Sequence, residues 1–117
     1  MYSYNAKLDR VIDGDTVDAM VDLGFSTWKK VRIRFYGIDT YETRTKDLEE
    51  KEKGLLAKQR VIDILNENDN VFILKSHGVD KFGRSLGEIF VTTLGETSLQ
   101  KILINEGHGV EYYGGSR

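Results

Sequence analysis

Hydrophobic and polar residues alternate with a period of two in the first third of the chain, which predicts β-strands there. The alternation is regular over residues 16–23 and 29–36 and weaker over residues 4–12. Asp13-Gly14-Asp15 separates the first two of these segments, and Asp-Gly is a strong hairpin dipeptide. We therefore predict three consecutive antiparallel strands joined by tight turns.

The rest of the chain predicts two helices and two further strands. Residues 47–66 form the first predicted helix, whose apolar face we expect to follow the heptad-like spacing of Leu48, Leu55, Ile62 and Leu65. Gly54 inside this helix costs about 1 kcal/mol against alanine, and we expect it to permit a close packing approach. The later segments are a strand at 71–75, a polar loop at 77–85, a strand at 86–92, a helix at 97–106 and an extended tail at 110–113.

The order of these elements, three strands, a helix, two strands and a helix, is the layout of an OB-fold barrel. The predicted fold class is therefore α+β, mainly β, with a five-stranded OB-fold barrel and two helices. The length of 117 residues predicts a single domain over residues 1–117.

The composition narrows the class of protein. Hydrophobic content of 39% and charged content of 31% are typical of a globular chain, and the lack of cysteine excludes disulfides and thiolate metal sites. The net charge of −2 argues mildly against a passive nucleic-acid binder, which is usually basic, and leaves an enzyme open. No segment approaches transmembrane length and no apolar signal region begins the chain, so we expect no membrane partner. This favours a cytoplasmic location, with a secreted mature form as the alternative.

The candidate chemistry lies where the third strand ends. Arg34, Asp39 and Glu42 fall at spacings that allow them to meet at one phosphate. Gly37 and the pair Asp39-Thr40 predict a turn directly after the strand. One cation and two carboxylates in close contact are a costly arrangement unless a metal ion or an anionic substrate organises them.

Two more polar side chains join this group if the chain closes into the predicted barrel. Asp15 follows the glycine of the first hairpin, and Arg84 lies in the second glycine-containing loop. In a five-stranded barrel, the first turn, the end of the third strand and the loop between the last two strands can open onto one side. Taken singly, each of these residues has an ordinary interpretation as a turn, strand or loop residue.

Other metal and phosphate motifs fail on spacing. An EF-hand loop needs a third oxygen ligand and then a glycine after Asp13 and Asp15, and Val17 stands at the third ligand position. His77 and His108 have no companions for a zinc site, and there is no His-Glu-x-x-His motif or glycine-rich loop ending in Gly-Lys-Ser/Thr.

Four motifs together resemble those of the staphylococcal nuclease (thermonuclease) family. They are residues 11–17, Arg34, residues 39–43 and residues 80–84, in the family's order and at family-like distances. The resemblance extends from about Lys7 to Gly107. Tyr41 stands where the family usually has proline, and Phe82 stands where the best-known member has tyrosine. The chain also stops near the point where that member continues into a third helix, so we expect this C-terminal helix to be absent.

The resemblance implies a role for each matching residue. These roles are Ca²⁺ ligation by Asp15, Asp39 and the backbone carbonyl of Thr40, catalysis by Arg34, Glu42 and Arg84, and substrate binding by Lys81, Phe82 and Tyr113. Glu42 corresponds to the general base that activates water, and the two arginines correspond to the groups that bind the scissile phosphate.

The function implied by the resemblance is a Ca²⁺-dependent nuclease that hydrolyses DNA, RNA or both with little sequence preference and leaves 3′-phosphates. We expect a monomer or a weak dimer. The alternative is a catalytically silent nuclease-like OB domain that binds nucleic acid or a protein. A third interpretation, an unrelated OB-fold structural domain, requires all four motifs to be coincidental.

Overall fold

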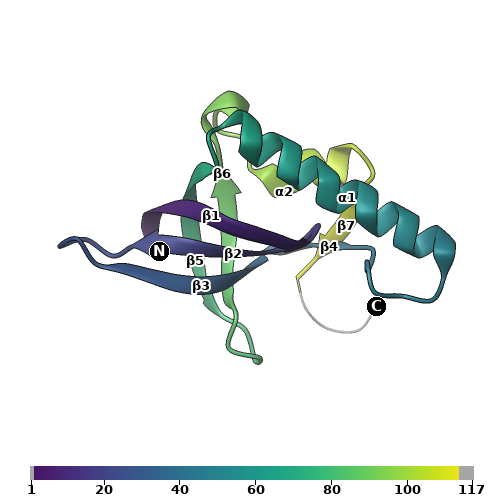
Figure 1. Ribbon diagram of the computed structural model, residues 1–117, viewed down its shortest axis with the longest axis horizontal. Helices are drawn as coiled ribbons and strands as arrows, with labels where there is room; N and C mark the ends of the chain where they lie inside the picture. The colour runs from purple at the N-terminus through teal and green to yellow at the C-terminus, as the bar shows by residue number, and fades with distance from the viewer. Residues whose placement is uncertain (1, 114–117) are drawn as a thin grey trace.

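The computed structural model describes residues 2–113 and shows a closed β-barrel with strand order β1-β2-β3-β6-β5 (Figure 1). The elements in chain order are β1 Ser3–Asp13, β2 Thr16–Asp22, β3 Trp28–Phe35, β4 Gly37–Thr40, α1 Leu48–Glu67, β5 Val71–Val79, β6 Ser85–Phe90, a 3₁₀ turn Thr92–Leu94, α2 Leu99–Asn105 and β7 Gly109–Tyr112. The prediction of a five-stranded barrel with two helices is therefore confirmed.

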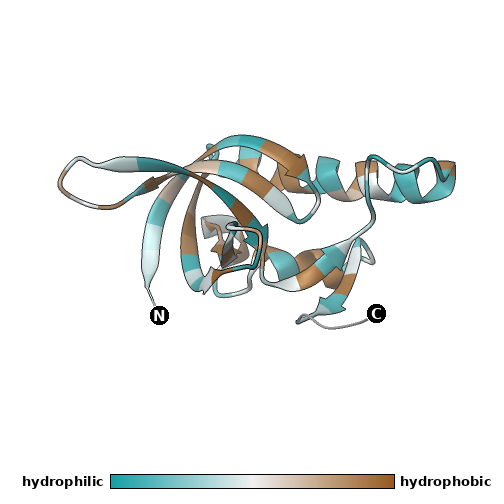
Figure 2. Cartoon of the chain, turned by 90° about the horizontal axis from the view of Figure 1, so that it is seen from below, coloured by the Kyte–Doolittle hydropathy of each residue, from teal (hydrophilic) through white to brown (hydrophobic). Residues whose placement is uncertain are grey.

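The barrel closes through a parallel pair. The strands β1, β2 and β3 pair antiparallel in sequence order, as the alternation predicts. β3 then runs parallel to β6, with Ile33 opposite Ser85 and Phe35 opposite Gly87. The side chains that point inward form one apolar core, which includes Val17, Ala19, Ile33, Phe35, Leu74 and Ile89. Figure 2 shows the resulting change between hydrophobic and hydrophilic positions along the strands.

Helix α1 lies across one end of the barrel (Figure 1). It begins after Asp47, whose side chain caps two backbone N–H groups of the first turn. The predicted apolar face was wrong at Leu48 and Leu55, which are 80% and 47% exposed. The residues that are buried instead follow the three-and-four spacing of a packed helix face, and they are Gly54, Ala57, Val61, Ile64 and Leu65.

A second, two-stranded sheet corrects the prediction of a turn at Asp39-Thr40. These residues lie in β4, which pairs antiparallel with β7 at the end of the described chain, so that the tail prediction is confirmed. The turn is confined to Tyr36, between β3 and β4, and is followed by Gly37 with a φ of 83°. Gly109 of β7 allows the close approach, because a Cβ there would lie 2.7 Å from the carbonyl oxygen of Asp39.

Strand β5 extends further than the apolar pattern predicts. It continues to Val79, so the polar loop predicted over residues 77–85 is reduced to residues 80–84. This short loop connects β5 to β6 at the parallel closure of the barrel. Among residues 2–113, neither helix is long and apolar enough to cross a membrane.

Candidate active site

Asp15 occupies the hairpin between β1 and β2 and is 8% exposed. Its carboxylate accepts hydrogen bonds from the Thr16 hydroxyl at 3.0 Å and from the Thr40 backbone N–H at 3.1 Å. Gly14 lets the hairpin lie against α1, because a Cβ there would come within 2.7 Å of the Ala57 Cβ. The hairpin and β4 therefore hold this carboxylate in one position.

Arg34 joins Asp39, which the sequence predicts beside it, to Asp15 of the first hairpin. Its Nη1 donates to the carbonyl oxygens of Phe35 and Ile38 at 2.8 and 2.7 Å. Its Nη2 lies 3.6 Å from an oxygen of Asp15 and 3.4 Å from an oxygen of Asp39. The Arg34 side chain is only 12% exposed, so these contacts are poorly screened by water.

The two carboxylates fit a hard divalent cation. Asp15 and Asp39 supply only oxygen donors, converge on the same guanidinium nitrogen and are largely shielded from solvent. Within the described residues no three His, Cys, Asp or Glu side chains group as a metal site, so backbone, water and substrate oxygens would complete the shell. Such mixed oxygen coordination is typical of Ca²⁺.

Arg84 is fixed by the loop that carries it. Asp80 accepts the backbone N–H groups of Phe82 and Arg84, both at 2.9 Å, and the Arg84 Nε at 2.7 Å. Burial alone would raise the pKa of Asp80, but these hydrogen bonds outweigh it and hold the pKa below its usual value. Asp80 is therefore an ionised clamp at neutral pH. No role for Asp80 was predicted from the sequence, although an aspartate at the start of a glycine-containing turn is a usable signal.

A pocket of about 610 Å³ brings the predicted phosphate- and substrate-binding residues together. Those that line it are Arg34, Lys81, Phe82, Arg84 and Tyr113. The Phe82 ring is 71% exposed, and the Lys81 and Arg84 cations lie 5.2 and 5.4 Å from its centroid. The Tyr113 ring packs against Gly37 on the side where a Cβ would lie, 3.1 Å from that position. Cations beside exposed aromatic rings are the usual surface for a nucleic-acid strand.

Glu42 lies in the loop between β4 and α1 and is exposed. It lines one pocket of about 410 Å³ together with Arg84 and another of about 280 Å³ together with Asp39 and Thr40. It therefore stands between the arginine side of the site and the carboxylate side. The sequence did not reveal that Glu50 of α1 also lines the second of these pockets.

Two contacts hold the loop that carries Glu42. The Thr43 hydroxyl donates to Asp13 at 2.6 Å, which ties the loop to the first hairpin. The backbone of Tyr41 and Glu42 rests on Gly54 of α1, where a Cβ would lie 2.7 Å from both carbonyl oxygens. The predicted close approach at Gly54 is thus confirmed.

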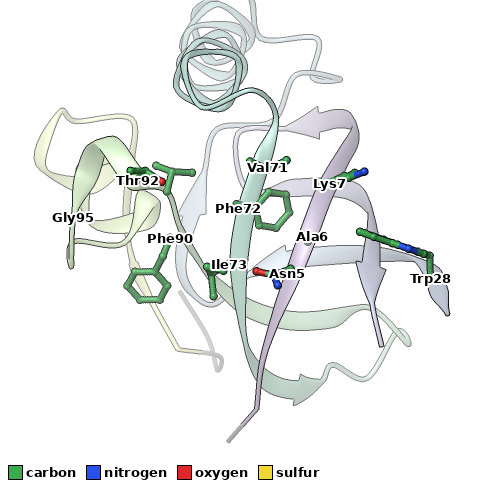
Figure 3. Close-up of a pocket in the computed structure, with 11 residues that line it drawn as sticks. Asn5, Ala6, Lys7, Trp28, Val71, Phe72, Ile73, Phe90, Thr92 and Gly95 are labelled. Carbon is green, nitrogen blue, oxygen red and sulfur yellow. The ribbon is translucent and has the colours of Figure 1, made fainter. Parts of the chain in front are cut away.

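A separate pocket of about 420 Å³ lies across β1 and β5 (Figure 3). Lys7 lies over the Trp28 ring there, 5.0 Å from its centroid. Its lining contains no carboxylate and none of the predicted site residues, so it offers no acid–base chemistry.

The closed barrel and its site define a small OB-fold domain in which carboxylates and arginines are grouped at one side of the barrel. The family model for staphylococcal nuclease homologues matches residues 32–116. The chain therefore belongs to the staphylococcal nuclease family. It is also 28% identical over 116 residues to endonuclease YhcR of Bacillus subtilis (strain 168). That match covers 94% of this chain and 9% of the relative, so the chain spans a small part of that protein.

Proposed function

We propose that this domain is a Ca²⁺-dependent nuclease that hydrolyses phosphodiester bonds of DNA, RNA or both with little sequence preference. The observation that carries the proposal is the convergence of Asp15 and Asp39 on Arg34, which shares a pocket with Arg84. Family membership and the similarity to an endonuclease support it independently.

The carboxylates have the role of metal ligands in this proposal. Asp15, Asp39 and the Thr40 carbonyl would hold Ca²⁺, which supplies positive charge and Lewis acidity at the phosphate when bound. The hydrogen bonds that Thr16 and Thr40 donate to Asp15 fix the orientation of that carboxylate before any ligand arrives.

The arginines and Glu42 act on the phosphodiester itself. Arg34 and Arg84 bind its non-bridging oxygens and stabilise the negative charge that grows as water adds to phosphorus. Glu42 orients this water and takes its proton, a contribution of roughly 10²- to 10⁴-fold. The bond from phosphorus to the 5′ oxygen then breaks and the departing oxygen takes a proton from solvent water, which leaves a 3′-phosphate on one fragment and a 5′-hydroxyl on the other.

The aromatic side of the pocket favours a single strand. Phe82 and Tyr113 can stack on bases only where these are unpaired, and Lys81 lies beside Phe82 to bind a neighbouring phosphate. We therefore expect single-stranded DNA and RNA to be cut faster than duplex.

The test is digestion of single-stranded DNA and of RNA with Ca²⁺ and with EDTA. Wild-type protein should cut only with Ca²⁺, Glu42→Gln and Arg84→Ala should lose at least 100-fold in kcat, and Lys101→Gln on the exposed face of α2 should match wild type. Calorimetric titration with Ca²⁺ alone should show binding that Asp15→Asn abolishes. Cleavage in EDTA would refute the metal assignment, and strand binding without cleavage would support the silent-domain alternative.

A further inference from the structure

A second charged pocket adjoins the site on the far side of Arg84. Its volume is about 410 Å³, and four arginines from separate parts of the chain line it. They are Arg10 of β1, Arg32 of β3, Arg44 of the loop before α1, and Arg84. Arg84 also lines the pocket of Phe82 and Tyr113, so the two pockets flank one guanidinium group.

The sheet register explains why two of these arginines lie together. Asp18 of β2 is opposite Arg10 on one side and opposite Arg32 on the other. Arg32 donates two hydrogen bonds to Asp18, at 2.8 and 3.1 Å, whereas Arg10 is 3.8 Å away with 64% of its side chain exposed. The hydrogen bonds from Arg32 lower the pKa of Asp18 against the opposing effect of burial, so this carboxylate is ionised at neutral pH.

The four arginines therefore differ in what already neutralises them. Arg32 and Arg84 are fixed by Asp18 and Asp80 at short distance. Arg44 is exposed and its guanidinium makes no ion pair or hydrogen bond with any part of the chain that the structure describes. Arg10 and Arg44 thus keep charge available for a ligand, beside two arginines that are held in place.

The ordinary interpretation of strand arginines is a solvated surface, and the position of this group argues against it. Arg32 and Arg34 lie two residues apart on β3, about 7 Å from each other on the same face of the strand. The arginine group is therefore continuous with the cations of the candidate active site. Glu42, the proposed general base, lines the same pocket. Asp13, the other carboxylate in the lining, accepts the Thr43 hydroxyl.

We propose that the pocket of Arg10, Arg32 and Arg44 binds a second backbone phosphate of the nucleic-acid strand, next to the phosphate that is cut. This inference rests on the proposed function and extends it. The strand would run from the Phe82 and Tyr113 pocket, past Arg84, into the arginine pocket. A bond whose flanking phosphate is missing on the arginine side is then a poor substrate, which favours cuts inside a strand over cuts at one of its ends.

The test removes the charge from either partner. The protein variant is the double substitution Arg10→Gln and Arg44→Gln, both at exposed side chains, with Lys101→Gln as the matched control. The substrates are short single-stranded DNAs in which one linkage beside the cut is an uncharged methylphosphonate, placed in turn on each side. Mass spectrometry identifies the product fragments, so that kcat/KM is obtained for the one bond next to the methylphosphonate linkage.

We expect the neutral linkage on the arginine side to lower wild-type kcat/KM about tenfold. The double variant should show a similar loss on the fully charged strand and no further loss on the neutral one. Equal sensitivity of the double variant and wild type to the neutral linkage, on both sides of the cut, would overturn the inference.

A binding measurement separates this inference from the proposed activity. Fluorescence anisotropy with Glu42→Gln protein in Ca²⁺ reports strand affinity without cleavage. Adding the two arginine substitutions to this background should flatten the dependence of log Kd on log salt by about 0.7 for each lost phosphate contact. An unchanged slope would refute the arginine pocket even if wild type cleaves, and a flattened slope would support it even if wild type does not.

Discussion

Gly54 holds the proposed general base in place through a contact that any larger residue would break. In Gly54→Ala the new Cβ would lie 2.7 Å from the carbonyl oxygens of Tyr41 and Glu42, and 3.4 Å is the start of ordinary contact. Helix and loop must therefore separate by about 0.7 Å at this point. Tyr41 cannot resist the shift as a proline would, because its φ is not fixed by a ring.

The expected effects on stability and activity differ in size. Alanine gains about 1 kcal/mol in helix propensity, and the overpacked contact costs about 1 to 3 kcal/mol. The free energy of unfolding should thus fall by only about 0 to 2 kcal/mol. A misplacement approaching 1 Å at a reacting group can cost about 100-fold. We expect kcat to fall about 10- to 100-fold while KM changes little, since Arg34 and Arg84 do not touch this contact.

The assay combines urea unfolding with kcat and KM on single-stranded DNA. Glu52→Ala, at an exposed position of the same helix, is the control and should match wild type in both. Glu42→Gln should cost less in the Gly54→Ala background than in wild type, because the base is already displaced. A kcat within twofold of wild type, together with the full effect of Glu42→Gln, would show that Gly54 does not position Glu42.

Three other contacts carry predictions. Asp80→Asn should release Arg84 and lower kcat/KM at least tenfold at neutral pH with Tm within a few degrees; steady-state kinetics that match wild type would contradict the clamp. Asp18 has a lowered pKa in the folded protein, so its stabilisation is complete above the unfolded value of 3.8 and is lost as pH falls below it. The gap in unfolding free energy between wild type and Asp18→Asn, about 1 to 2 kcal/mol at pH 6, should shrink below pH 4 in urea titrations; a constant gap would refute this. Gly109→Ala should push β7 off β4 and weaken Ca²⁺ binding measured by calorimetry, whereas Lys101→Gln should not.

The sequence predicted those parts of the fold that depend on neighbours along the chain. Period-two alternation located the meander, and Asp13-Gly14 located its first turn. It could not predict that Asp39-Thr40 is a strand, because these residues resemble a turn until β7, some seventy residues later, supplies their hydrogen bonds. Leu48 and Leu55 were misassigned because their spacing fits a heptad. The face of α1 that is buried instead includes Gly54, which allows close packing.

The candidate site divides in the same way. Its residue types follow from short motifs. The structure brings Arg34 together with Asp39 and Asp15, whereas Glu42 lines the neighbouring pockets. The Asp80 clamp, the Gly54 contact and the arginine pocket depend on which surfaces meet in space, and no local pattern encodes them. The roles of the predicted residues stay predictions until the variants above are measured.

The parallel pairing of β3 with β6 has a consequence for how activity is acquired. Arg34 lies opposite Leu86, about fifty residues away in sequence, and Arg84 directly precedes β6. Pairings of such long separation form late, because the entropy of loop closure must be overcome first. A refolding chain can complete the β1–β2–β3 meander while its two site arginines are still far apart. Recovery of cleavage during refolding should therefore lag behind the recovery of β-structure. The rate at which cleavage recovers would then report the rate of barrel closure.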